Sequence, residues 1–86
     1  MGKFKITDTD IKEVKLIVPL VHEDQRGWFF ESYSKGELLA EGINVHFVQD
    51  NHSYSSKAGT IRGIHFQNEP KAQTKLVRCT RGSVID

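Results

Sequence analysis

The sequence has little of several features that define special classes of protein. Its 86 residues contain one cysteine and two prolines, and no apolar run approaches the roughly 20 residues of a membrane-spanning helix. A single thiol excludes an internal disulfide, and the N-terminus lacks the hydrophobic stretch and cleavage site of a secretion signal. We therefore expect neither a membrane protein nor a secreted one, and predict a cytoplasmic location.

What is present is the composition of an ordinary folded domain. Hydrophobic residues make up 37% and charged residues 27% of the chain, which excludes the disordered and collagen-like classes. A chain of this length predicts a single domain over residues 1–86 and excludes a multidomain enzyme.

The net charge of +1 hides an uneven distribution. Residues 1–56 carry six basic against nine acidic side chains, and residues 57–86 carry six against two, so the balances are −3 and +4. The basic residues of the last third are spaced singly, which favours individual anion contacts, or a solvated face of a sheet, over a nucleic-acid tail. They are Lys57, Arg62, Lys71, Lys75, Arg78 and Arg81.

Short apolar runs between turn residues predict a mostly β structure. Strands are expected at Lys15–Pro19 and Trp28–Tyr33, with turn chemistry at Glu23–Gly27 between them. Ser34 and Glu37 form a capping box, which predicts one short helix that ends at Gly42. The remaining strands are expected at Val45–Asn51, Thr60–Gln67, Thr74–Thr80 and Ser83–Asp86, separated by turns at Ser55–Gly59, Asn68–Pro70 and Arg81–Gly82. This pattern predicts an all-β sandwich or barrel.

The last of these strands, Ser83–Asp86, has no return strand after it to cover its far edge. Folded proteins usually cover or close such an edge. We therefore expect either that the 86 residues are part of a longer sandwich or that a partner completes the edge.

Two carboxamides share one face of the strand that begins at Val45. Period-two alternation places Gln49 and Asn51 on the same face as Val45 and Phe47, and His46 on the opposite face. Buried carboxamides need partners, so the pair is either a satisfied structural pair or a polar contact to a ligand.

His65 is the candidate general base. A lone histidine on a strand is more often structural, but Arg62 and Lys75 would bring two cations towards this imidazole and keep it neutral. Strict alternation would put Arg62 and His65 on opposite faces. Gly63 between them is the natural place for a bulge that re-aims one of the two.

Metal binding is not predicted, and Cys79 is assigned no role. The four histidines show no ligand spacing, and Gln67 stands where the metal-binding cupin motif would place a second histidine after His65. Cys79 has the same strand parity as Val77, which predicts a small buried apolar residue.

Five motifs in order resemble the N-terminal half of the dTDP-4-dehydrorhamnose 3,5-epimerase family. They are Asp24–Glu31 (DQRGWFFE), Phe47–Ser53 (FVQDNHS), Ile61–Gln67 (IRGIHFQ), Lys75–Arg78 (KLVR) and Arg81–Asp86 (RGSVID). The resemblance runs from about residue 15 to the last residue and spans about half of the family's length. It implies a cupin jelly roll, also called a double-stranded β-helix, homodimers that exchange N-terminal strands, and no cofactor.

The resemblance also implies a reaction. The family inverts C3 and C5 of dTDP-4-dehydro-6-deoxyglucose by removing protons next to the C4 ketone, on the pathway to dTDP-L-rhamnose. By the motif match, His65 is the general base and Lys75 the cation that stabilises the enolate. The match places the substrate-binding roles on Arg62 near the charged groups, on Gln49 and Asn51 along the pocket, and on Arg26 and Glu31 at the nucleotide end.

The family's general-acid tyrosine and histidine-orienting aspartate belong to its second half. Tyr33 and Tyr54 do not match that tyrosine's motif, and Asp50 belongs to another motif. We therefore expect poor turnover unless these groups are supplied elsewhere. The alternative is a cupin-like module that binds a nucleotide sugar or completes a dimer without catalysis. Nucleic-acid binding is least favoured, because the aromatics at 28–30 lie far from the basic side chains in sequence.

Overall fold

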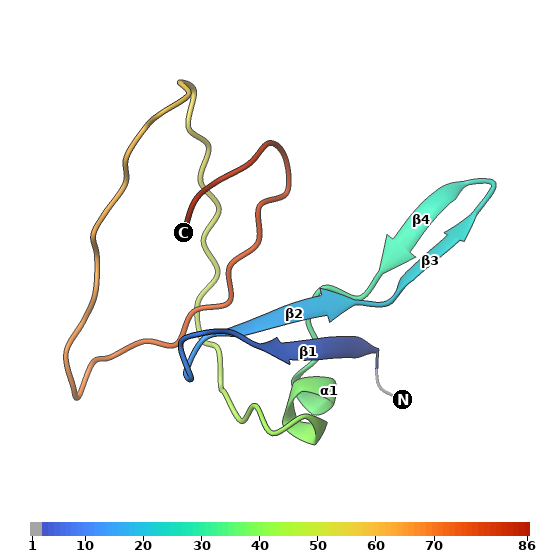
Figure 1. The fold of residues 1–86 in the computed structure, drawn as a ribbon, viewed down its shortest axis with the longest axis horizontal. Coiled ribbons are helices and arrows are strands. Elements are labelled where there is room, and N and C mark those ends of the chain that lie inside the picture. The colour runs from blue at the N-terminus through green and yellow to red at the C-terminus, as the bar shows by residue number, and fades with distance from the viewer. Residues whose placement is uncertain (1–2) are drawn as a thin grey trace. The chain divides into compact units, whose positions relative to one another are not determined.

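The computed structural model describes residues 3–86 and groups the chain into two compact units. The first unit ends at His46 and the second runs from Phe47 to Asp86. All strands and helices of the described residues lie in the first unit, which holds four strands and one short helix (Figure 1). This content agrees with the predicted all-β class, whereas the single domain stays a prediction.

The first unit begins with an antiparallel hairpin. Strand β1 (Phe4–Asp8) pairs with β2 (Lys15–Pro19) in a register that runs from Phe4 opposite Pro19 to Asp8 opposite Lys15. The bounds of β2 are those predicted from the sequence. The sequence interpretation missed β1, although its residues alternate between apolar and polar in FKIT.

A second hairpin follows directly. Strand β3 (Val21–Asp24) pairs with β4 (Gly27–Phe30), so the turn is narrower than the predicted Glu23–Gly27. Strand β4 also ends at Phe30, before the predicted Tyr33. Gly27 has φ +133°, a conformation that favours glycine. The rings of Trp28 and Phe30, on one face of β4, stack with centroids 5.4 Å apart.

The capping box forms the predicted helix. Helix α1 (Lys35–Ala40) starts where the Ser34 hydroxyl accepts a hydrogen bond from the Glu37 backbone N–H at 3.3 Å. It ends before Gly42, which has φ +86° and donates its N–H to the Leu39 carbonyl at 3.0 Å. The start and the end of this helix are therefore both confirmed.

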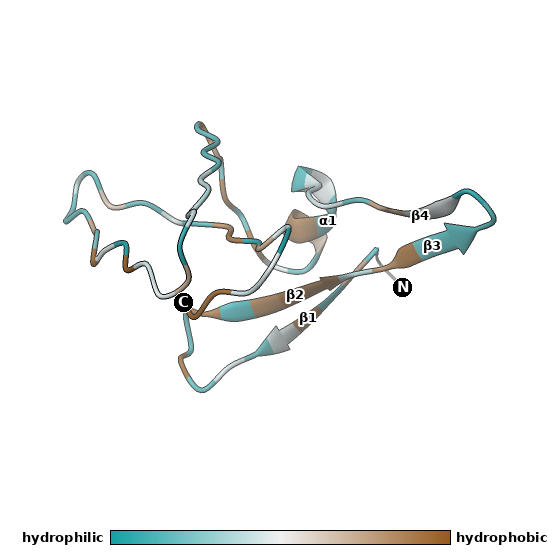
Figure 2. Cartoon of the chain, turned by 90° about the horizontal axis from the view of Figure 1, so that it is seen from above, coloured by the Kyte–Doolittle hydropathy of each residue, from teal (hydrophilic) through white to brown (hydrophobic). Residues whose placement is uncertain are grey.

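The hydrophobic core of the described residues is small, with one side chain from β1 and one from α1. Among residues 3–86, the buried hydrophobic side chains are Phe4, 6% exposed, and Leu38, 3% exposed. The backbone N–H of Lys3 donates to Glu37 at 3.3 Å, which ties the start of β1 to the helix. Much of β2 is hydrophobic (Figure 2), yet its residues Leu16 and Val18 are 56% and 46% exposed.

The strands predicted after residue 44 are not present in the structure. No strand forms over Val45–Asn51, Thr60–Gln67, Thr74–Thr80 or Ser83–Asp86, while the turns between them do form. The Lys57 carbonyl accepts the Thr60 N–H at 3.4 Å, the Asn68 carbonyl accepts the Lys71 N–H at 2.9 Å, and the chain bends at residues 80–82. Turns need only local contacts, whereas a strand needs a second strand alongside.

Part of the predicted alternation survives without a strand. Val45 and Phe47 are half-buried while His46 and Val48 are exposed, as the period-two pattern predicts, but Gln49 is exposed. Within the described residues, no helix is long and apolar enough to cross a membrane.

Candidate functional site

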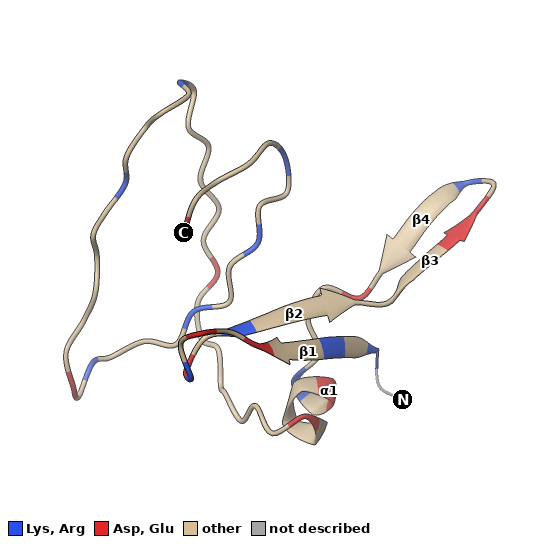
Figure 3. Cartoon of the chain, viewed as in Figure 1, with Lys and Arg blue, Asp and Glu red and all other residues tan. Residues whose placement is uncertain are grey.

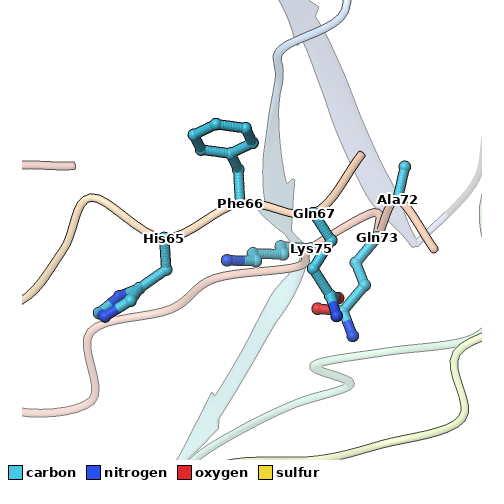
Figure 4. A pocket seen from close by; sticks show the side chains of 6 residues that line it. All are labelled: His65, Phe66, Gln67, Ala72, Gln73 and Lys75. Atoms are coloured by element: carbon cyan, nitrogen blue, oxygen red, sulfur yellow. The ribbon is translucent and has the colours of Figure 1, made fainter. Parts of the chain in front are cut away.

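His65 and Lys75 line the same hollow in the second unit. The hollow has a volume of about 540 Å³, and its other lining residues are Phe66, Gln67, Ala72 and Gln73 (Figure 4). The turn at Asn68–Lys71 reverses the chain and so brings the two lining segments together. The sequence thus places the candidate base and the candidate cation on opposite sides of one turn.

The side chains of the hollow point in alternating directions. In Figure 4 the imidazole of His65 and the carboxamide of Gln67 lie on one side of the chain, and the Phe66 ring lies on the other. The Lys75 side chain runs in the direction of His65 in this view. All lining residues are exposed, and the volume falls within the range of small-molecule sites, about 300–1,000 Å³. An accessible imidazole can accept a proton, and a nearby ammonium can stabilise an anion.

Arg62 precedes the hollow and is held by its own loop. Its Nε donates to the Ser55 hydroxyl at 3.0 Å and its Nη2 donates to the Tyr54 carbonyl at 2.8 Å. Gly63 has φ +122°, a conformation that favours glycine. The β-bulge predicted at Gly63 is absent, because no strand forms over these residues.

The structure does not gather all predicted binding residues at the hollow. Gln49 and Asn51 are exposed in the irregular segment after Phe47 and, with Arg62, are not part of its lining. Their predicted contact with a ligand therefore stays a prediction.

Arg26 and Glu31 lie in the first unit, where each forms an ion pair. The guanidinium of Arg26 folds back on Asp24 with a closest contact of 2.6 Å, at the charged tip of the β3–β4 hairpin (Figure 3). Glu31 accepts a hydrogen bond from the Lys3 ammonium at 2.7 Å.

These ion pairs shift the pKa values of their members. The hydrogen bond from Arg26 lowers the pKa of Asp24, and the hydrogen bond from Lys3 lowers the pKa of Glu31. The same bonds raise the pKa values of Arg26 and Lys3. All four groups are therefore held in their charged forms.

Sequence reasoning missed three polar residues near the candidate site. Gln67 and Gln73 line the hollow, and each lies two positions from a candidate catalytic residue, so the alternation could have identified them. Ser55 falls in a predicted turn, and no sequence signal links it to Arg62.

One further prediction is wrong, and the metal prediction stays open. Cys79 is exposed and its thiol donates to the Arg81 carbonyl at 3.3 Å, because the strand that would have buried it does not form. Within the described part of the chain, His, Cys, Asp and Glu side chains form no cluster of three or more that could hold a metal ion.

Comparison with known proteins gives one consistent result. The sequence profile described as dTDP-4-dehydrorhamnose 3,5-epimerase matches residues 8–86. Curated proteins named dTDP-4-dehydrorhamnose 3,5-epimerase are similar to the chain. The protein from Sinorhizobium fredii is 51% identical over 76 residues, that from Shigella flexneri 49% over 82, and that from Methanothermobacter thermautotrophicus 42% over 86.

These matches cover most of this chain but a smaller share of each relative. They span 88%, 94% and 100% of the chain, and 39%, 45% and 45% of the three relatives. The chain therefore spans less than half the length of these curated relatives. No solved structure matches it.

Proposed function

Because the chain belongs to the dTDP-4-dehydrorhamnose 3,5-epimerase family, we propose that it serves the inversion of C3 and C5 in dTDP-4-dehydro-6-deoxyglucose. This reaction lies on the route to dTDP-L-rhamnose. The observation that carries the proposal is that His65 and Lys75, the two residues expected to do the chemistry, line one hollow. The expected reaction needs no cofactor.

The proposed chemistry begins with an acidic C–H bond. The C4 ketone acidifies the protons on C3 and C5, because the electron pair left by deprotonation moves onto the ketone oxygen. His65 takes the proton on a ring nitrogen, and the Lys75 ammonium stabilises the negative oxygen of the enolate. A proton delivered to the opposite face of the same carbon then inverts the centre. We assign no residue of this chain to that second proton transfer.

The other predicted residues bind the nucleotide in this proposal. Arg62 contacts the charged diphosphate, since a guanidinium donates two parallel hydrogen bonds to phosphate oxygens. Gln49 and Asn51 contact the sugar nucleotide along the pocket. Arg26 and Glu31, which are paired with Asp24 and Lys3, contact its nucleotide end.

We also propose the architecture and location that go with this family. The second unit exposes Val48, Ile61, Ile64 and Phe66, all at positions where strands of a cupin jelly roll were predicted. Pairing with further strands would bury such residues, and the expected assembly is a homodimer with exchanged N-terminal strands. A cytoplasmic location is part of the same proposal.

Solvent exchange tests the proposed activity. The test uses this chain joined to the family's second half, which is expected to supply the general acid and the histidine-orienting aspartate. This protein is incubated in D2O with dTDP-4-dehydro-6-deoxyglucose, and proton NMR follows the signals of C3 and C5. We expect deuterium at both carbons, and none in dTDP-glucose, which lacks the ketone. Binding of the keto sugar without exchange would contradict catalysis and favour the non-catalytic binding module. Absence of binding would contradict both functions.

A further inference from the structure

We propose that Ser55 is a positioning residue that aims the Arg62 guanidinium at an anionic ligand, an inference that rests on the function proposed above. Arg62 Nε donates to Ser55 Oγ at 3.0 Å, and Arg62 Nη2 donates to the carbonyl of the preceding residue, Tyr54, at 2.8 Å. Two consecutive residues therefore hold one guanidinium.

The loop between these residues closes on itself. The Lys57 carbonyl accepts the Thr60 backbone N–H at 3.4 Å and the Thr60 hydroxyl at 2.7 Å. This turn reverses the chain midway between Ser55 and Arg62, which are seven positions apart, and so brings them within hydrogen-bond distance. The bond to Ser55 therefore fixes the arginine with respect to its own loop.

The geometry leaves the ligand-binding edge of the guanidinium accessible. Nε and Nη2 lie on one edge of the planar group, and the bonds to Ser55 and Tyr54 use two of its five N–H donors. The end formed by Nη1 and the second N–H of Nη2 can still donate two parallel hydrogen bonds to a phosphate. Arg62 is exposed, so a ligand can reach it.

Holding Arg62 in place should raise affinity without altering the chemical step. A free arginine side chain loses rotamer freedom when it binds an anion, whereas a side chain already held has less to lose. Ser55 does not line the hollow of His65 and Lys75, so its loss should leave proton abstraction unchanged. The expected signature is a change in KM with little change in kcat.

The test compares three single variants by dTDP calorimetry and by keto-sugar kinetics. Ser55→Ala should weaken dTDP binding and raise KM about tenfold, with kcat within about twofold, because a hydrogen bond to a charged group is lost. Ser55→Thr keeps a hydroxyl and should restore binding. Ser56→Ala is the matched control, because Ser56 takes part in neither bond to Arg62, and it should behave as wild type.

A double variant tests whether Ser55 acts through Arg62. The Arg62→Lys variant has no guanidinium to bond to Ser55 and Tyr54. In this background, Ser55→Ala should therefore cause no further loss of dTDP affinity. The inference is overturned if Ser55→Ala binds dTDP as tightly as Ser56→Ala, or if its effect persists in the Arg62→Lys background. A wild-type protein that binds no dTDP would contradict the proposed function itself, which is a distinguishable result.

Discussion

The two units of this chain differ in their secondary structure and buried side chains, and in how many predicted site residues they contain. The first has both hairpins, the helix and the two buried hydrophobic side chains, Phe4 and Leu38. The second has turns joined by exposed chain. Yet the second holds five of the seven predicted site residues, namely Gln49, Asn51, Arg62, His65 and Lys75. The strands and helix and most of the predicted site residues therefore lie in different parts of this sequence.

Several basic side chains also differ between the units in the partners they have. In the first unit, Lys3, Lys15 and Arg26 each form an ion pair with a carboxylate. In the second, Lys75 lines an open hollow, and Arg62 is held by a hydroxyl and a carbonyl, which leave its charge uncompensated by an acidic partner. Cations without an acidic neighbour attract anions most strongly, which fits a ligand that carries a diphosphate.

Removing the positive charge of Lys75 should slow the chemical step without weakening dTDP binding. Lys75→Met keeps the stem and removes the ammonium, so the chemical step should lose roughly 3 kcal/mol of transition-state stabilisation while dTDP binding changes little. Exchange kinetics and calorimetry measure the two effects. Lys71→Met is the control, because Lys71 lies in the adjacent turn and does not line the hollow. An equal loss of dTDP affinity would make Lys75 a phosphate ligand instead.

A core substitution should act on the ordered unit. Leu38→Ala removes a side chain that is only 3% exposed, and we expect it to lower the free energy of unfolding by about 2 kcal/mol. Leu39→Ala, at a 52% exposed position of the same helix, should cost far less. Urea denaturation followed by circular dichroism measures both values. Equal losses would contradict the assignment of the core to Leu38.

The helix cap makes a smaller contribution. Ser34→Ala removes the acceptor of the Glu37 N–H and should cost about 1 kcal/mol of stability. Ser34→Asp, which also caps well, should retain most of it. The same denaturation experiment reports the result, and a stable Ser34→Ala protein would show that the cap bond is unimportant for α1.

The smallest expected effect concerns pH. Because the Lys3 hydrogen bond lowers the pKa of Glu31, Lys3→Met should raise that pKa towards its ordinary value. A depressed carboxyl pKa contributes stability above the unfolded-state pKa, and this contribution is lost as pH falls through the folded-state pKa. Carboxyl NMR titration measures the shift. Lys5→Met should leave Glu31 unchanged, and an unchanged Glu31 in Lys3→Met would refute the pairing.

The sequence predicted the local elements more accurately than the pairing of distant ones. The bounds of β2, the capping box and the turns after residue 55 each depend on neighbouring residues and are present, whereas the turn predicted at Glu23–Gly27 is narrower. The strands expected after residue 44 depend on partners far along the chain, and they do not form. Strands β1 and β3 were missed: the alternation of β1 was not recognised, and Glu23 and Asp24 of β3 were assigned to a turn.

Some residues of the candidate site could be identified from the sequence and others could not. Motifs in the sequence identified His65 and Lys75, and the turn between them explains why they share a hollow. Ser55 was missed because its bond to Arg62 depends on which side chains the folded loop brings together. Contacts of this kind follow from three-dimensional positions that residue spacing alone does not specify.

The central claim, that the hollow of the second unit carries the proton transfer, depends most on His65. We predict that, in a full-length form that also carries the family's second half, His65→Asn lowers deuterium incorporation at both C3 and C5 by at least ~100-fold, the loss typical of a general base. His46→Asn, at an exposed histidine that does not line the hollow, should exchange at the wild-type rate. A His65→Asn protein that keeps more than about a third of the wild-type rate would contradict the account, because a general base contributes far more than that.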